Sequence, residues 1–158
     1  MDTTQLCTEL ATALQTRGWM MATAESCTGG LIAARCTDLS GSSHWFERGF
    51  VTYSNAAKSE LIGVPAQLIA QHGAVSEAVA CAMAHGAMAH SHAQVSVAVT
   101  GVAGPSGGSA DKPVGTVWFA WCVGNVLTSE RRVFPGDRSA VREATVAHAL
   151  QGLLDRLH

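Results

Sequence analysis

Hydrophobic residues along the chain alternate between helical and extended spacing, and polar turns separate the segments. Leu6, Leu10 and Leu14 lie four residues apart in segment 3–16, which predicts an amphipathic helix that ends at Gly18. The same reasoning predicts helices at 28–36, 55–62, 76–90 and 138–157, with a further helix beginning at Pro65. Strands are predicted at 19–24, 45–53, 95–99, 114–123 and 126–134.

The order of these elements indicates the fold class. Strands alternate with helices over most of the chain, which favours an α/β protein with helices on both faces of one sheet. Strands 114–123 and 126–134 are neighbours in sequence and predict an antiparallel hairpin, so the sheet is mixed. The 158 residues, 47% of them hydrophobic, can bury one core, and no linker divides them. We therefore predict a single-domain three-layer α/β/α sandwich over residues 1–158.

Composition disfavours two classes of partner. The formal net charge is −2 and the chain has only two lysines, whereas a nucleic-acid groove needs a clustered basic face. The first residues lack the basic flank and apolar stretch of a signal peptide, and no apolar run is long enough to span a bilayer. We expect a cytoplasmic protein that binds neither nucleic acid nor membrane.

Cysteine and histidine spacing gives no sign of a metal site. The five cysteines are scattered without CxxC pairing, so we expect free thiols and no thiolate cluster. His85 and His90 are five residues apart and point to different faces of a helix, and no HExxH pattern occurs. Surface or core histidines are the simpler interpretation.

Segment 24–30 is the first candidate for chemistry. It places Ser26 and Cys27 where a strand turns into a helix, and the N–H groups of a helix N-terminus can stabilise an oxyanion or a bound anion. Gly29 and Gly30 allow backbone and ligand to approach closely. Serine and glycine are also ordinary helix caps and turn residues, so both interpretations stay open.

A second strand-to-helix junction holds two residue types that are rare in this chain. Tyr53 is the only tyrosine, and Lys58 follows five positions later in the first turn of the predicted helix. The helix dipole disfavours a cation there, and with partial burial it would lower the pKa of the amine and free it to act as a general base. The alternative is a solvent-exposed lysine. Ser26, Tyr53 and Thr100 all lie at the ends of predicted strands, where open α/β sheets bind ligands.

Five ordered segments resemble the successive motifs of the CinA C-terminal domain family. They are Thr23–Gly30, Val51–Lys58, Gly73–Ser76, Thr100–Gly108 and Lys112–Val117. Stand-alone members of that family are nicotinamide-nucleotide amidohydrolases. The resemblance therefore implies hydrolysis of the carboxamide of nicotinamide mononucleotide to nicotinic acid mononucleotide and ammonia, for pyridine-nucleotide salvage. It also implies a homo-oligomer of α/β/α subunits that needs no metal or cofactor.

The resemblance also implies roles for individual residues. The family's nucleophile corresponds to Ser26, with Lys58 as base and Tyr53 assisting. Thr100 and Arg138 correspond to substrate contacts. Chemistry agrees with this assignment, because a serine that attacks an amide carbon needs a neighbouring base to take its proton.

An oxyanion and a phosphate each need a binding site of their own. The N–H groups of Cys27 and Thr28, or of Gly101, are candidates for the oxyanion hole. Arg138 and Arg142 lie four apart near a helix start and suit a phosphate, although Arg142 could instead pair with a surface acid. The predicted substrate contacts are Thr28, Gly29, Gly30, Thr100, Gly101, Arg138 and Arg142.

Three alternatives remain. Cys27 is intrinsically the better nucleophile, but its side chain is one step along the chain from Ser26 and is expected to pack inward. Glu25 could orient Lys58 or cap the loop. In longer proteins linked with competence and DNA damage, the same domain could be a non-catalytic ligand- or protein-binding module. The ADP-ribose pyrophosphatase activity of those proteins' N-terminal domain is not expected of this chain.

Overall fold

The computed structural model describes all 158 residues as a mixed sheet covered by helices. In chain order the elements are α1 (Thr3–Arg17), β1 (Met21–Glu25), α2 (Leu31–Thr37), the 3-10 turn η1 (Ser42–His44), β2 (Phe46–Val51), α3 (Asn55–Ile62), α4 (Ala66–His72), α5 (Glu77–Ala89), β3 (Val95–Gly101), β4 (Thr116–Val123), β5 (Val126–Val133) and α6 (Arg138–Arg156).

The strand order in the sheet is β2-β1-β3-β4-β5. β1 runs parallel to β2 and β3, whereas β4 and β5 are antiparallel to their neighbours. The predicted mixed sheet is therefore confirmed. Because β1, β2 and β3 are parallel, their carboxyl ends at Glu25, Val51 and Gly101 meet at one edge, where ligands of open α/β sheets bind.

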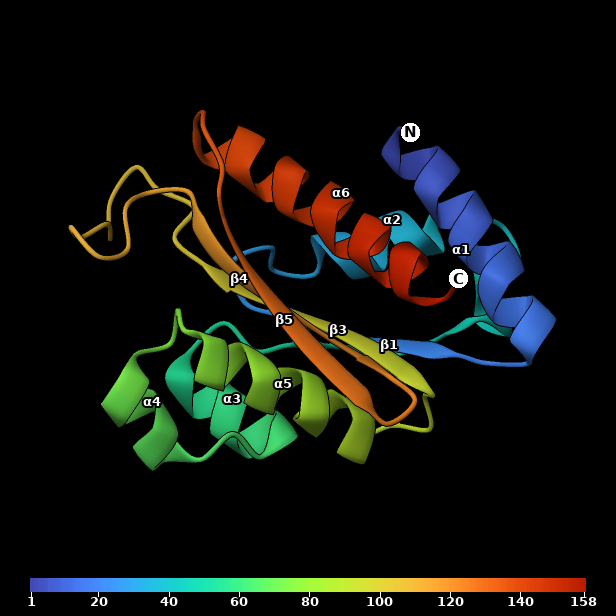
Figure 1. The fold of residues 1–158 in the computed structure, drawn as a ribbon, viewed down its shortest axis with the longest axis horizontal. Coiled ribbons are helices and arrows are strands. Elements are labelled where there is room, and N and C mark those ends of the chain that lie inside the picture. Colours follow the sequence, from blue (N-terminus) through green and yellow to red (C-terminus); the bar gives the residue numbers. More distant parts are fainter.

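Helices cover both faces of the sheet. Figure 1 shows α1, α2 and α6 in an upper layer and α3, α4 and α5 in a lower layer. Large side chains such as Trp121 and Phe119 fill the core under the upper layer, whereas small residues such as Ala22 and Ala98 of the sheet face the lower layer. The alternation of large and small inward residues along β1 and β3 reflects the two-residue period of a strand. The three-layer sandwich predicted from the sequence is confirmed.

The boundaries of α1 and α2 illustrate what ends and begins these helices. Asp2 and Gln5 form a capping box at the start of α1, and Gly18 ends it in a left-handed conformation at φ 66°, as predicted. The helix predicted at 28–36 was placed too early, because α2 begins at Leu31. Gly29 and Gly30 have φ of 60° and 104°, outside the helical range, so residues 26–30 form a turn.

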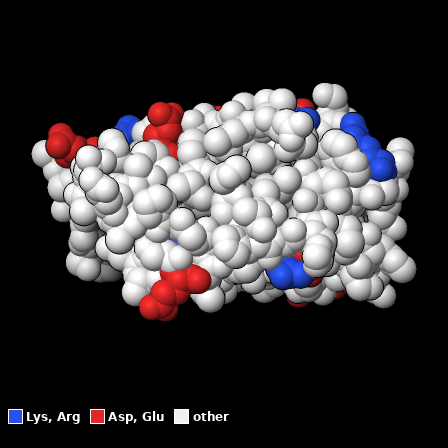
Figure 2. Space-filling view, turned by 90° about the horizontal axis from the view of Figure 1, so that it is seen from below, with Lys and Arg blue, Asp and Glu red and all other residues white.

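The lower layer carries few charged side chains. Figure 2 views the molecule from that side and shows acidic and basic groups only in small, separate clusters. Residues 61–110 contain a single charged residue of the Asp, Glu, Lys or Arg types, Glu77. None of the helices combines the length and apolarity that crossing a bilayer requires.

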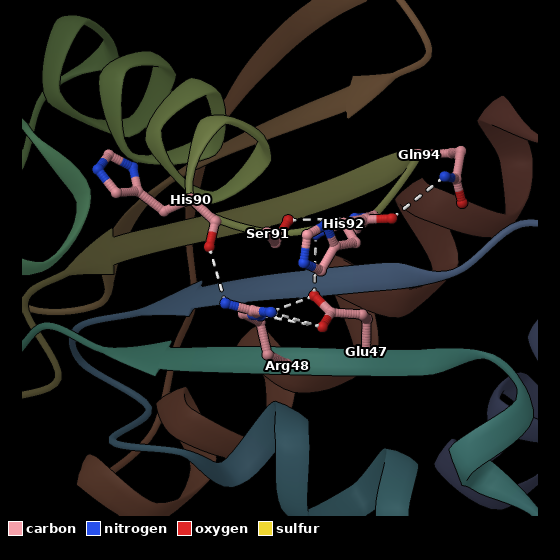
Figure 3. A network of polar contacts seen from close by, with 7 residues as sticks. Glu47, Arg48, His90, Ser91, His92 and Gln94 are labelled. Atoms are coloured by element: carbon pink, nitrogen blue, oxygen red, sulfur yellow. Dashed lines mark hydrogen bonds and ion pairs between the residues drawn. The ribbon is translucent and has the colours of Figure 1, made fainter.

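A polar network secures strand β2, whose outer edge has no strand partner. Arg48 Nη1 donates to the carbonyl oxygen of His90 at 3.0 Å, and the Glu47 carboxylate accepts from the backbone N–H of His92 at 3.1 Å. Figure 3 shows both side chains reaching across to the connection between α5 and β3. Since Met21 pairs with Phe46, this network lies at the end of the sheet opposite Glu25. It is therefore part of the fold and not of the site described next.

Candidate active site

Ser26 follows the carboxyl end of β1, an inner strand that lies between β2 and β3. Its backbone N–H donates to the carbonyl oxygen of Val99 at 3.1 Å, which continues the pairing of β1 with β3 by one residue. The side chain is 8% exposed and opens into a cavity of about 230 Å³. Of the predicted site residues, the cavity is lined by Ser26, Lys58, Tyr53, Thr100, Gly101 and Arg138.

Lys58 is the basic group of this cavity and is 1% exposed, so its interpretation as a solvent-exposed residue is wrong. Its Nζ lies 3.1 Å from Ser26 Oγ, 2.9 Å from the carbonyl oxygen of Thr52 and 3.2 Å from that of Tyr53. A neutral amine has two N–H groups, which match the two carbonyl acceptors, and a lone pair, which is left for the Ser26 hydroxyl. This arrangement suits a base that takes the proton of Ser26.

The surroundings of Lys58 make the neutral amine easier to form than it is in water. Burial lowers the pKa of Lys58, because the charged form loses its hydration and no carboxylate contacts it in compensation. Ser54 caps α3 by accepting from the N–H of Ala57 at 3.0 Å, so Lys58 stands in the first turn as predicted. The partial positive charge of that helix end acts in the same direction.

Cys27 packs inward, as predicted. It is 6% exposed and belongs to the core below the upper layer, although it also borders the cavity. Burial raises the pKa of the Cys27 thiol to about 12, so the thiol stays protonated at neutral pH. A protonated buried thiol is a poor nucleophile, which leaves Ser26 as the stronger candidate.

Glu25 caps α2 and does not contact Lys58. Its carboxylate accepts from the hydroxyl of Thr28 and from the backbone N–H groups of Ile32 at 2.8 Å and Ala33 at 3.1 Å. Of the two roles considered for Glu25, the structure supports the cap. Because the N–H groups of α2 are occupied in this way, donors for an oxyanion must come from the preceding turn.

That turn holds three backbone donors without partners. The carbonyl oxygen of Ser26 accepts from the N–H of Gly29 at 3.0 Å, and that of Thr28 accepts from the N–H of Leu31 at 3.1 Å. The N–H groups of Cys27, Thr28 and Gly30 have no acceptor within the protein, and of these three residues only Cys27 lines the cavity. Unpaired N–H groups beside a nucleophile are what an oxyanion hole requires.

Tyr53 and Arg138 meet at the mouth of the cavity. Arg138 Nη2 donates to the Tyr53 hydroxyl at 3.4 Å, and its Nη1 donates to the carbonyl oxygen of Gly104 at 2.9 Å. Tyr53 is 60% exposed, and only its backbone carbonyl contacts Lys58. The lysine therefore contacts Ser26 directly, without a tyrosine hydroxyl between them.

Thr100 and Gly101 shape the wall at the end of β3. Thr100 Oγ1 donates to the carbonyl oxygen of Ala74 at 2.9 Å and so fixes the loop between α4 and α5. At Gly101, a Cβ atom would lie 2.8 Å from the carbonyl oxygen of Thr116, so only glycine fits there. Both residues line the cavity, and their predicted contact with substrate stays a prediction.

Thr28, Gly29, Gly30 and Arg142 lie outside the cavity lining. Thr28 is fully buried against Glu25, while the two glycines provide the positive φ angles of the turn. Arg142 pairs with no acid: its Nε donates to the carbonyl oxygen of Cys27 at 3.2 Å and its Nη2 to that of Thr28 at 3.0 Å. Their predicted contact with substrate stays a prediction.

The cavity also includes residues for which the sequence suggested no role. They are Asn55, Ala74, Val75 and Ala103. The side chain of Ser54 caps α3, and the neighbouring Asn55 takes no part in the cap. The Gly73–Ser76 motif was the available signal for the loop that contributes Ala74 and Val75. Two grooves of about 390 and 400 Å³, between α1 and α6 and between α3 and α4, lack a nucleophile with a neighbouring base.

No group of three or more His, Cys, Asp or Glu residues is arranged to hold a metal ion, and all five cysteines are free thiols. The Ser26 cavity itself contains one buried amine and no carboxylate. It is therefore suited to nucleophilic chemistry by its own side chains.

Known proteins are similar to this chain in both sequence and fold. The nicotinamide-nucleotide amidohydrolase PncC of Escherichia coli (strain K12) is 54% identical over 151 residues, which are 94% of this chain and 91% of that protein. PncC of Pseudomonas putida is 57% identical over 151 residues, or 96% and 94% of the two chains. A CinA-like protein of Akkermansia muciniphila is 55% identical over 135 residues, which are 85% of this chain but only 33% of that protein.

Solved structures agree over almost the whole length. The competence/damage inducible protein CihA of Agrobacterium tumefaciens has a TM-score of 0.95 at 45% identity and covers 98% of this chain and 95% of its own. The competence-damaged protein (CinA) superfamily protein of Enterobacter cloacae has a TM-score of 0.96 at 34% identity. The match covers 100% of this chain and 94% of that protein. The sequence profile of the CinA C-terminal domain matches residues 3–157. The chain therefore belongs to the CinA C-terminal domain family.

Proposed function

We propose that this chain is a nicotinamide-nucleotide amidohydrolase that converts nicotinamide mononucleotide and water into nicotinic acid mononucleotide and ammonia. Two relatives that bear this activity in their names are more than half identical to it over nine-tenths of both chains. The observation that carries the proposal is the contact of 3.1 Å between the buried Lys58 amine and the Ser26 hydroxyl.

The first half of the reaction forms an ester with Ser26. Ser26 Oγ attacks the carboxamide carbon while Lys58 takes the hydroxyl proton, and the resulting oxyanion accepts from the N–H group of Cys27, which lines the cavity. Lys58 then returns the proton to the amide nitrogen, and the C–N bond breaks to release ammonia. The nicotinoyl group stays bonded to Ser26.

The second half reverses these roles with water in place of ammonia. Lys58 takes a proton from a water molecule that attacks the ester carbon, and the Ser26 oxygen leaves with that proton. An amine of ordinary pKa, about 10.4, would be protonated at neutral pH and could not start either half. The lowered pKa of Lys58 is therefore a requirement of the mechanism.

The remaining cavity residues serve substrate binding in this proposal. Arg138 at the mouth has a planar guanidinium suited to the phosphate of the nucleotide, and the Tyr53 hydroxyl, which accepts from Arg138 Nη2, helps to hold the guanidinium in place. Thr100 and Gly101 form the wall behind the carboxamide. No cofactor or metal takes part. A cytoplasmic homo-oligomer that acts in pyridine-nucleotide salvage is the expected context, on the strength of the family resemblance alone.

Ammonia release from nicotinamide mononucleotide tests the proposal. Wild type and Cys27→Ala should release ammonia with chelator present, and Ser26→Ala should release none. Turnover by Ser26→Ala would remove Ser26 as the nucleophile, and loss of turnover on adding chelator would contradict a metal-free reaction.

A binding module is the second candidate, because the domain also forms about a third of a longer CinA-like protein. Absence of ammonia release by folded wild-type protein, together with binding of the intact nucleotide in a calorimeter, would favour this candidate over the enzyme.

A further inference from the structure

Thr100 and Ser26 stand beside one another at the ends of neighbouring strands. The Ser26 N–H donates to the carbonyl oxygen of Val99, which continues the parallel pairing of β1 with β3 and brings Ser26 level with Thr100. Neighbouring strands are about 4.8 Å apart, and side chains two residues apart on a strand share a face. Ala24 and Ala98, two residues earlier on each strand, belong to the core under the lower layer. Both hydroxyl groups therefore lie on the face that α3, α4 and α5 cover (Figure 1).

The single proton of the Thr100 hydroxyl is used within the protein. Oγ1 lies 2.9 Å from the carbonyl oxygen of Ala74. A carbonyl oxygen can only accept, so Thr100 is the donor in this hydrogen bond. Thr100 is 1% exposed, lines the cavity, and its oxygen receives no hydrogen bond from the protein. A buried oxygen that can only accept is thus left free beside the nucleophile.

The other polar groups next to Ser26 differ from Thr100 in what they offer. The Lys58 amine contacts Ser26 Oγ at 3.1 Å and supplies the base. The N–H of Cys27 has no acceptor in the protein and supplies a donor. A carboxamide has one oxygen that accepts and one NH2 group that donates. The cavity offers a partner for each, the Cys27 N–H for the oxygen and the Thr100 oxygen for the NH2 group.

We propose that Thr100 is a specificity-determining residue whose oxygen accepts an N–H of the substrate carboxamide and so selects an amide over the corresponding ester or acid. The proposal rests on the proposed function, in which Ser26 is the nucleophile, and it states which substrate group Thr100 contacts and with what polarity. An ester has no N–H at this position. A carboxylate would bring an oxygen against the lone pairs of Thr100. The hydroxyl can donate to a substrate oxygen only by giving up its bond to Ala74.

The experiment compares two substrates that differ at the leaving group alone. Nicotinamide mononucleotide has an NH2 group where the methyl ester of nicotinic acid mononucleotide has a methoxy group. Thr100→Val keeps the shape of the side chain and removes the hydroxyl, and Thr100→Ser keeps the hydroxyl. Since kcat/KM covers the steps up to loss of the leaving group, it is the quantity to compare.

Thr100→Val should lower kcat/KM for the amide by about 5- to 150-fold, because an N–H of the bound amide is left without a partner. The ester should react at nearly the wild-type rate, which also shows that the variant is folded. Thr100→Ser should stay close to wild type on both substrates. Equal losses on amide and ester in Thr100→Val would overturn the proposal, since a hydroxyl that donates to the oxyanion would serve both.

Ser76→Ala is the matched control for a disturbed loop between α4 and α5. Ser76 Oγ donates to the carbonyl oxygen of Gly73 at 2.8 Å, as Thr100 does to that of Ala74, but Ser76 does not line the cavity. A shifted loop should change amide and ester hydrolysis by the same factor. A loss confined to the amide in Ser76→Ala as well would overturn the proposal, because the selectivity would then come from the loop.

Binding without turnover gives a second readout. Added to Ser26→Ala, the Thr100→Val change should weaken binding of nicotinamide mononucleotide in a calorimeter but not binding of nicotinic acid mononucleotide. Weaker binding of the acid would contradict an oxygen that only accepts. Wild type that hydrolyses neither the amide nor the ester would overturn the proposed function, whereas equal losses on two substrates that wild type does hydrolyse overturn the role of Thr100 alone.

Discussion

Replacement of Lys58 by methionine should abolish turnover and at the same time change how stability depends on pH. Methionine keeps most of the buried chain volume but removes the amine that contacts Ser26 and the carbonyls of Thr52 and Tyr53. Loss of a general base lowers kcat by about 100- to 10,000-fold. The only other lysine, Lys112, donates to the carbonyl oxygen of His72 at the surface, and Lys112→Met is therefore the matched control.

The sign of the stability effect follows from the lowered pKa of Lys58. In the unfolded chain the pKa of this amine is about 10.4. Between the lowered folded value and 10.4 the unfolded state binds more protons than the folded state, so the free energy of unfolding rises with pH in that window. One proton of difference corresponds to a slope of about 1.4 kcal/mol per pH unit. At pH values below the folded pKa or above about 10.4, the contribution of Lys58 to the free energy of unfolding does not change with pH.

Urea unfolding at a series of pH values measures this slope. The difference between wild type and Lys58→Met isolates the contribution of the one amine, because the other titrating groups are common to both proteins. The pH at which the difference begins to rise should coincide with the acidic limb of kcat/KM, which reports the same group in the free enzyme. Parallel stability profiles for the two proteins up to pH 10 would refute the argument that Lys58 is a base.

Three further predictions concern single residues. Ser26→Ala should leave the melting temperature nearly unchanged and remove ammonia release, because its hydroxyl contacts only Lys58; a drop of many degrees would mean that the serine is structural. Arg138→Ala should raise KM for the mononucleotide more than for the riboside, as measured by initial rates, and equal effects on both would contradict a phosphate contact. Gly101→Ala should lower the free energy of unfolding by about 1–3 kcal/mol in urea titrations, because the new Cβ would lie 2.8 Å from the Thr116 carbonyl oxygen. An unchanged urea midpoint would show that the backbone around Thr116 moves to make room for the methyl group.

The architecture was predictable because local signals and the global fold agree. The spacing of Leu6, Leu10 and Leu14 and the stop at Gly18 marked α1, and the alternation of strand-like and helix-like segments gave the element order and the sheet type. The start of α2 was misplaced because the turn at 26–30 depends on the carboxylate of Glu25 reaching forward to Ala33. A cap that comes from seven or eight residues upstream leaves no periodic signal.

The site was predictable only as far as strand ends could locate it. The parallel order of β1, β2 and β3 brings Ser26, Tyr53 and Thr100 to one cavity, as expected from their places at strand ends. The burial of Lys58 depends on tertiary packing, and local sequence left it undecided. The two arginines of α6 share a helix face by spacing, but only the structure distinguishes the one that reaches the cavity from the one that reaches the backbone of the turn.

The position of Ser26 between two helix layers affects how the protein tolerates mutation. Lys58 reaches the turn from the lower layer and Arg142 reaches it from the upper layer, while the strand that carries the serine belongs to neither. A repacked side chain far from the cavity that shifts either layer by a few tenths of an ångström changes one of these contacts. The rate of ammonia release therefore depends on the packing on both faces of the sheet. In a library of random variants, many proteins that still fold should have lost activity.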